Sequence, residues 1–172
     1  MQKGKPPRLL RFESPQDERA HIVNEIARAV EQGVPLRHIL VLLVSWQGTQ
    51  ALQEALNRRL GRNTTKDPKD TPPGDFVRVI TVNAGTGLES PIVFVAGIHE
   101  MFEQEDSLLL GEYERAELIR EHTRKLYIAF TRAGQRLILT CVGDVPASLK
   151  AIAQQGLLII RLTSSNGRAP TP

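Results

Sequence analysis

Ile39-Leu40-Val41-Leu42-Leu43-Val44 is a run of six apolar residues with no polar residue at alternate positions. Such a run is typical of a strand covered on both faces, as the strands of a parallel sheet are. A helix is expected before it, because Ser14-Pro15 suits a helix start, apolar residues recur at helical spacing from 23 to 30, and Gly33 ends the pattern. A second helix is expected after it, from about 48 to 60. The run therefore predicts an inner strand of an α/β fold.

The rest of the chain continues this alternation. Apolar runs predict strands at 9–12, 77–82, 91–96, 137–142 and 157–162, and helices are expected at 112–131 and 146–154. Residues 61–75 and 100–110 are interpreted as loops, and the polar tail 163–172 as disordered. Because helices that join parallel strands make right-handed crossovers, we expect a three-layer α/β domain with a mostly parallel sheet. Ligand chemistry in such a sheet is expected at the carboxyl ends of the strands, after Val82, after Ala96 and around Arg132.

The composition is that of one ordinary soluble domain. The chain has 172 residues, a net charge of +3 and a pI of about 9.3, a mild positive excess that is compatible with a polyanionic partner. No apolar run approaches the ~20 residues that cross a bilayer, so we expect no membrane partner and a cytoplasmic location. The single cysteine, Cys141, excludes an internal disulfide and is expected to be a small buried hydrophobe.

The remaining polar and aromatic residues give little sign of a site. The four histidines lack ligand spacing, and we predict no metal site. Glu103, Glu105 and Asp106 are expected in a solvated loop. Trp46 follows a strand, where packing at the edge of the sheet is the expectation, with base stacking as the alternative.

Thr81-Val82-Asn83-Ala84-Gly85-Thr86-Gly87-Leu88-Glu89-Ser90 lies between two of the expected strands. Gly85 and Gly87 would let the backbone approach a phosphate or a sugar closely, and a carboxylate follows them. A phosphate-binding P-loop ends in Gly-Lys-Ser/Thr, which this segment does not supply. Its glycines alone indicate an ordinary turn.

Arg124-Lys125-Leu126-Tyr127-Ile128-Ala129-Phe130-Thr131-Arg132-Ala133 ends the longest expected helix. An arginine just before a buried strand is usually a surface or salt-bridged residue. It can also stabilise the charge on a phosphoryl group during transfer, which is the role of an arginine finger.

Together the two segments are similar to motifs V and VI of UvrD/Rep-type superfamily 1 DNA helicases, usually T-x-H-x-x-K-G-L-E-F and R-R-L-x-Y-V-x-x-T-R-A. Phe12-Glu13-Ser14, the apolar run from Ile39 and Leu52-Gln53-Glu54-Ala55-Leu56 also resemble the second motor domain of that family. The resemblance covers most of the chain and implies a RecA-like domain over 1–162.

The resemblance implies a role for each matching residue. Arg132 would reach the γ-phosphate of ATP, Glu89 would contact the ribose, and Gly87 would allow the close approach. Thr81 and Asn83 would lie against the backbone of single-stranded or partly duplex DNA. ATP with Mg²⁺ would be bound mainly by an N-terminal RecA-like domain, and translocation would run 3′ to 5′. This chain has no phosphate cradle of its own, so we expect it to be inactive alone.

The departures from the family motifs affect function more than fold. Asn83 stands in place of the motif V histidine, Thr86 in place of its lysine, and Ser90 in place of its phenylalanine. Val44 replaces a basic residue that the family often carries after its second strand. The loop 61–75 stands where UvrD-type enzymes insert an accessory domain.

Two other readings remain open. Asn83, Thr86 and the short loop favour a non-catalytic nucleic-acid or protein-binding module derived from a helicase domain. An unrelated small α/β protein would require both motif matches to be coincidental.

Overall fold

The computed structural model describes residues 6–61, 64–65, 74–85 and 87–163. These residues form one sheet of six parallel strands in the order β3-β2-β4-β5-β1-β6. The strands are β1 (Arg8–Phe12), β2 (Ile39–Leu43), β3 (Arg78–Thr81), β4 (Ser90–Ala96), β5 (Ala133–Val142) and β6 (Ile159–Leu162). The helices are α1 (Pro15–Glu31), α2 (Trp46–Leu60), α3 (Ile98–Glu105), α4 (Glu112–Phe130) and α5 (Ala147–Gln154), with a short 3₁₀ turn at Leu36–His38. The expectation of an α/β fold with a parallel sheet is confirmed.

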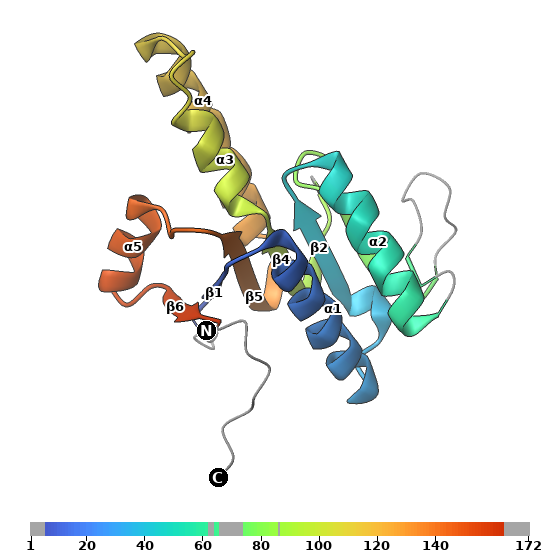
Figure 1. Ribbon diagram of the computed structural model, residues 1–172. Coiled ribbons are helices and arrows are strands. Elements are labelled where there is room, and N and C mark those ends of the chain that lie inside the picture. The colour runs from blue at the N-terminus through green and yellow to red at the C-terminus, as the bar shows by residue number, and fades with distance from the viewer. Residues whose placement is uncertain (1–5, 62–63, 66–73, 86, 164–172) are drawn as a thin grey trace.

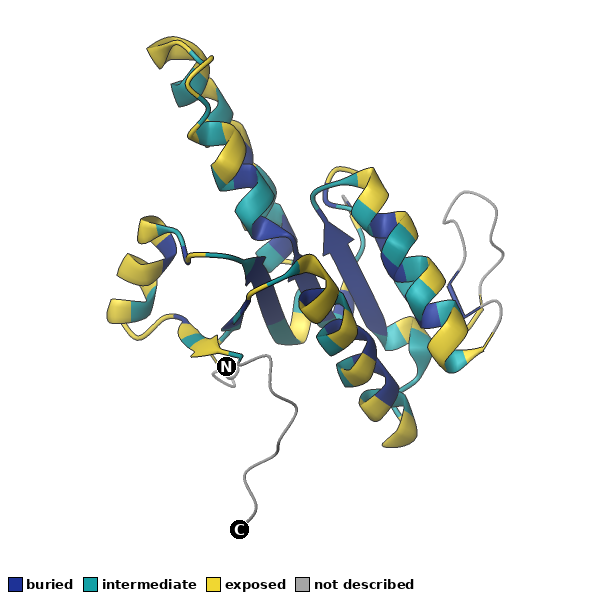
Figure 2. Ribbon diagram, in the orientation of Figure 1, coloured by how far each residue is buried: buried dark blue, intermediate teal, exposed yellow. Residues whose placement is uncertain are grey.

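Strand β2 is buried along its whole length, as its apolar run predicts (Figure 2). Its side chains alternate between two hydrophobic clusters, because successive residues of a strand face opposite sides of the sheet. Leu40 and Leu42 belong to one cluster, whereas Val41 and Leu43 belong to the other. The sheet therefore has a core on each face.

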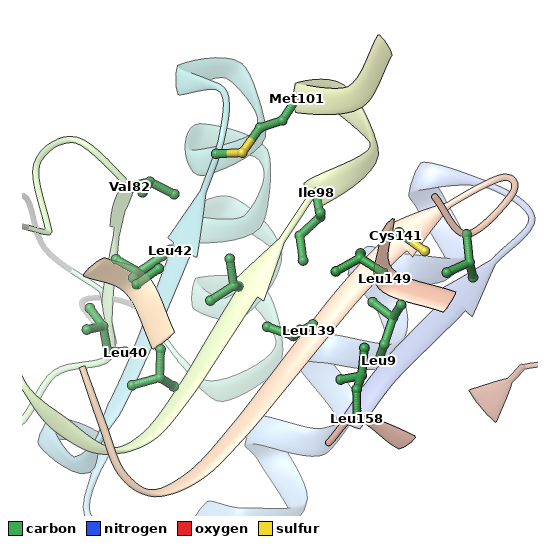
Figure 3. Close-up of a cluster of buried hydrophobic side chains, with 14 of the residues drawn as sticks. Leu9, Leu40, Leu42, Val82, Ile98, Met101, Leu139, Cys141, Leu149 and Leu158 are labelled. Carbon is green, nitrogen blue, oxygen red and sulfur yellow. The ribbon is translucent and has the colours of Figure 1, made fainter. Parts of the chain in front are cut away.

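Each core is closed by its own helices (Figure 1). Ile26 of α1 and Leu56 of α2 are fully buried in the second cluster. Met101 of α3, Ala129 of α4 and Leu149 of α5 lie in the first cluster, part of which is drawn in Figure 3. The domain thus has three layers, helices–sheet–helices.

Helix α1 begins as its sequence predicts. The Ser14 hydroxyl oxygen accepts a hydrogen bond from the backbone N–H of Asp17 at 3.1 Å, which satisfies one of the free donors of the first turn. Pro15 occupies the first helical turn, where a missing N–H costs nothing.

Residues 100–110 are not a loop throughout, so that prediction was wrong. Helix α3 occupies Ile98–Glu105, and its Ile98 and Met101 are buried. With α4 it forms a helical hairpin that projects from the rest of the domain (Figure 1). Only two of its eight side chains are fully buried. Two buried positions are too few to show a helical periodicity, so the sequence pattern of α3 cannot be distinguished from that of an acidic loop.

The interpretation of Glu105 as part of a solvated loop was also wrong. Its carboxylate lies 2.7 Å from Nδ1 of His122 on α4, and the side chains are only 13% and 5% exposed. This contact joins the two arms of the hairpin. The two residues are 17 positions apart in the sequence. Their contact could not be predicted without knowing that α3 and α4 run antiparallel.

The base of the hairpin is tied to the sheet through a buried carboxylate. Glu18 of α1 is 8% exposed, and its Oε1 accepts hydrogen bonds from the backbone N–H of Gly97, at 3.0 Å, and from the hydroxyl of Thr140. Nδ1 of His99 accepts a hydrogen bond from the N–H of Val142 at 3.0 Å. The carboxyl ends of β4 and β5 therefore fix where α3 starts.

Several element boundaries differ from the expectation. Strand β5 begins at Ala133 instead of 137, and β6 begins at Ile159 instead of 157. Within the segment 61–75, Thr65 forms an isolated bridge with Val77. The backbone N–H of Thr163 bonds to the carbonyl of Arg11, while residues 164–172 of the expected tail lie outside the described residues.

The Cys141 thiol should be unreactive in the folded chain. Cys141 is fully buried in β5, as expected, and burial raises the pKa of its thiol to about 11. Since the thiolate is the nucleophile, we expect alkylation by iodoacetamide at pH 8 to be about 100-fold slower in the native chain than in urea. Rates followed by mass spectrometry would test this; equal rates in both states would contradict it.

Candidate functional site

The segment from Thr81 to Ser90 crosses the sheet. Strands β3 and β4 are parallel and are separated by β2. Their connection must therefore run from the side of the sheet where the strands end, here called the carboxyl edge, to the side where they begin, here called the amino edge. At the carboxyl edge, the N–H of Val82 donates to the carbonyl of Leu43 at 2.9 Å. At the amino edge, the carbonyl of Glu89 accepts from Nη2 of Arg78 at 2.9 Å. None of the described residues of this connection is helical.

Gly85 is needed for this crossing. It is buried, and a Cβ atom on it would lie 2.6 Å from Cδ2 of Leu42 and 3.6 Å from Cδ1 of Ile80. The missing side chain therefore lets the backbone pack onto β2. This packing fits the ordinary turn that the glycines alone indicate.

Gly87 keeps the features that the sequence suggests for close approach to a ligand. It is exposed, and a Cβ atom on it would meet nothing within 4 Å. Its φ of +85° lies in the left-handed region, which strains residues with a side chain. Thr86, before it, lies outside the described residues.

A tight turn follows β3 at the carboxyl edge. The N–H groups of Ala84 and Gly85 both donate to the carbonyl of Thr81 at 3.1 Å. The hydroxyl oxygen of Thr81 accepts a longer bond of 3.4 Å from the N–H of Ala84. Asn83 is exposed at the apex of this turn. The turn thus presents a hydroxyl and an amide at the end of the strand.

Arg132 lies between the end of α4 and the start of β5. Its Nε donates to the carbonyl of Ile128 at 3.1 Å, and its Nη2 lies 3.4 Å from the hydroxyl oxygen of Thr131. Within the described ranges, none of the ion pairs includes Arg132. A guanidinium has five donors, so Arg132 is held by its own helix end while retaining donors for a further acceptor.

The two sequence motifs meet at the amino edge of the sheet. The N–H of Ser90 donates to the carbonyl of Arg132 at 3.0 Å, and Ser90 pairs with Ala133 at the start of β5. Glu89 directly precedes Ser90, so it lies next to the residue that bonds to Arg132. The segment around Arg132 was expected at the carboxyl ends of the strands. That placement was wrong, because α4 returns to the amino edge before β5 begins.

The expected site residues thus fall into two groups. Glu89 and Arg132 lie at the amino edge, whereas Thr81 and Asn83 lie at the carboxyl edge. One segment of chain, from 82 to 89, joins the two edges.

Arg78 belongs to the amino-edge group and was missed. Besides its bond to Glu89, its Nε is buried without a hydrogen-bond partner in the described residues, and burial lowers the pKa of its guanidinium. The available signal was an arginine between the apolar residues Val77 and Val79, a charge inside a strand pattern.

Trp46 is not packed as expected. It is the first residue of α2 and is 58% exposed, so edge packing does not bury it. Among the described residues, no three His, Cys, Asp or Glu side chains are grouped so that they could hold a metal ion. In the same ranges, none of the helices combines the length and the apolar character that crossing a membrane requires.

Comparison with known proteins supports the resemblance. Residues 59–143 match the UvrD-like helicase C-terminal domain. The chain is 32% identical to an ATP-dependent helicase/nuclease subunit of Lactobacillus helveticus (strain DPC 4571), in an alignment that covers 47% of this chain and 9% of that protein. It is 34% identical to the protein of the same name from Lysinibacillus sphaericus (strain C3-41), over 41% of this chain and 8% of that protein. The chain thus spans less than a tenth of these relatives.

The fold also matches a solved structure. The C-terminal domain of a possible DNA helicase from Lactobacillus plantarum WCFS1 superposes with a TM-score of 0.65 and 18% sequence identity. The match covers 91% of this chain and 86% of that one. At this identity the likeness concerns the fold.

Proposed function

The chain carries a UvrD-like helicase C-terminal domain, and from this premise we propose that it is the second motor domain of an ATP-dependent DNA helicase. ATP with Mg²⁺ would lie between this domain and an N-terminal RecA-like domain that supplies the phosphate cradle. In this proposal the RecA-like domain of residues 1–162 provides one wall of the nucleotide cleft and part of the DNA surface.

The observation that carries the proposal is the contact between the two motifs at one edge of the sheet. The backbone bond from Ser90 to Arg132 keeps the exposed Glu89 beside the arginine. A nucleotide has a ribose with two hydroxyls and a chain of phosphates. A carboxylate can accept hydrogen bonds from the ribose, and a guanidinium can stabilise charge on the transferring phosphoryl group. One strip of surface thus offers both partners.

The proposed role of Arg132 is that of an arginine finger. It contributes to the reaction only when the two motor domains close, because the phosphates are held by the other domain. The finger must therefore be fixed in direction before closure. The bond from its Nε to Ile128 and the backbone bond from Ser90 provide that fixation.

The proposed DNA contact lies at the opposite edge. Thr81 and Asn83 would hydrogen-bond to phosphate oxygens of single-stranded DNA, as hydroxyl and amide groups commonly do. Opening and closing of the nucleotide cleft would then move the strand in steps, in the 3′ to 5′ direction that the family resemblance implies.

Comparing the ATPase activity of the complete protein with that of this chain alone tests whether the other motor domain supplies the phosphate cradle. The complete protein that carries this chain should hydrolyse ATP faster when single-stranded DNA is present. The 172-residue chain alone should release no phosphate above a buffer control, because Gly87-Leu88-Glu89 stands where a phosphate cradle would end in Gly-Lys-Ser/Thr. DNA-stimulated hydrolysis by the isolated chain would contradict the proposal.

A second candidate function is a nucleic-acid-binding module without catalysis, which the exposed amide of Asn83 favours. In either case, fluorescence anisotropy should detect binding of labelled single-stranded DNA that weakens as salt rises. Asn83→Ala should weaken that binding by roughly 2- to 10-fold, since one hydrogen bond contributes ~0.5–1.5 kcal/mol. Asn24→Ala, at an exposed position of α1, is the matched control and should leave the affinity unchanged. An unaltered affinity for Asn83→Ala would remove this residue from the DNA surface.

A further inference from the structure

The tip of the α3–α4 hairpin exposes large apolar side chains. Leu108 and Leu109, in the turn between the helices, are 97% and 94% exposed, and Tyr113 in the first turn of α4 is 77% exposed. These three residues, here called the leucine tip, stand at the end of a hairpin that projects away from the sheet (Figure 1). Adjacent apolar residues at a projecting point are typical of a protein contact.

The charge of the hairpin narrows the class of partner. Residues 98–130 carry eight acidic and four basic side chains, a net charge of −4, whereas the whole chain carries +3. The remainder of the chain is therefore +7. The acidic residues include Asp106, Glu112 and Glu114, which flank the leucine tip. Because like charges repel, this surface disfavours the phosphate backbone of nucleic acid and favours a basic protein surface with apolar positions.

A pocket with that chemistry lies elsewhere on the same chain. It has a volume of about 340 Å³ and lies over β1, β5 and β6, beside α1. Its basic residues are Arg8, Arg136 and Arg161, and its apolar residues are Leu10, Ile138 and Leu162. The carboxylate of Glu25, which also lines it, is 3.5 Å from Nη2 of Arg136 and is thereby partly neutralised.

The margin of the pocket is open to a partner. Leu162 is 73% exposed there, and the side chain of Arg136 is 39% exposed. The hairpin extends from the carboxyl edge of the sheet and points away from it (Figure 1), so the tip does not reach the pocket of its own chain.

We propose that the leucine tip of one copy of this chain docks into the arginine-rimmed pocket of a second copy. Leu108 and Leu109 bury their side chains against the apolar residues of the pocket. Asp106, Glu112 and Glu114 face Arg8 and Arg161. The contact joins two different surfaces, so it closes into a pair when two such contacts form reciprocally and otherwise extends into longer assemblies. This inference does not depend on the proposed motor function.

Sedimentation equilibrium of the 172-residue chain over a dilution series in low salt tests the proposal. Wild type should show a mass that rises with concentration. Replacing both leucines, Leu108→Asn with Leu109→Asn, should weaken the association at least tenfold, because the apolar surface of two leucine side chains would no longer be buried. Arg161→Glu should also weaken it, and higher salt should weaken the wild-type association. All three substituted residues are exposed, so the variants should retain the wild-type melting temperature.

A mixing experiment separates the two surfaces. The tip variant keeps its pocket, and the pocket variant keeps its tip, so a mixture of the two should associate more tightly than either variant alone. Trp46→Gln, which removes an exposed aromatic that belongs to neither surface, is the control and should behave as wild type. A wild-type chain that stays monomeric throughout, or a tip variant that associates normally, overturns the proposal. A tip variant that loses affinity for single-stranded DNA while wild type is monomeric also overturns it and assigns the tip to nucleic acid.

Discussion

Replacing Arg132 with alanine in the helicase that carries this domain should lower kcat for ATP hydrolysis by about 10³-fold or more, the range measured for arginine fingers. The effect should fall on kcat, because the finger acts on charge that develops in the transition state. KM for ATP should change little. Steady-state phosphate release with saturating single-stranded DNA would measure both.

A conservative variant and a control variant show whether the loss of activity is specific to the guanidinium of Arg132. Arg132→Lys keeps the charge but loses the planar fork of donors, so it should recover only part of the rate. Arg120→Ala removes an exposed arginine from α4, the helix that precedes Arg132, and should leave kcat within twofold of wild type. The bonds made by the Arg132 side chain stay within its own helix end, so the melting temperature of Arg132→Ala should stay close to that of wild type. Near wild-type turnover in that variant would rule out the finger role.

The second large effect concerns Leu42, which supports the crossing segment. Leu42 is 1% exposed in β2, and Leu42→Ala should lower the free energy of unfolding by about 2–5 kcal/mol. That is a large part of the ~5–15 kcal/mol that stabilises a typical domain. Urea unfolding followed by circular dichroism would measure it.

The same site allows a test of the contact with Gly85. Gly85→Ala alone places a Cβ atom 2.6 Å from Cδ2 of Leu42 and should cost about 1–3 kcal/mol. In the Leu42→Ala background that cost should fall, because the side chain that opposes the new methyl group is gone. Leu40→Ala, at a fully buried position on the same face of β2, is the control. Its effect and that of Gly85→Ala should add to within ~0.5 kcal/mol. If the effects of Leu42→Ala and Gly85→Ala also added to within ~0.5 kcal/mol, the contact between Gly85 and Leu42 would be contradicted.

The inner strand and the long helices could be predicted because their patterns are strong. The run from Ile39 has no polar interruption, and α1 carries both a cap and a periodic apolar face. Helix α3 was missed because its buried face consists of two residues among several acidic ones. The start of β5 was missed because Gln135 and Arg136 lie in a part of the strand that is not fully buried and therefore lack an apolar pattern.

The sequence suggested candidate site residues but not where in the fold they lie. The structure brings the motifs that contain Glu89 and Arg132 side by side, since Ser90 bonds to Arg132. They did not indicate the edge of the sheet, because that depends on strand order and on the path of the 82–89 segment. The contribution of Arg78 depends on the same path, since it contacts Glu89 only after the segment has crossed β2.

The crossing segment limits how this protein can change over evolutionary time. Its ends are fixed at opposite edges of the sheet, and Gly85 holds its middle against Leu42. Substitutions between 82 and 89 can adjust chemistry at either end, but an inserted or deleted residue would move both ends at once. Homologous sequences should therefore keep a constant length between Thr81 and Ser90.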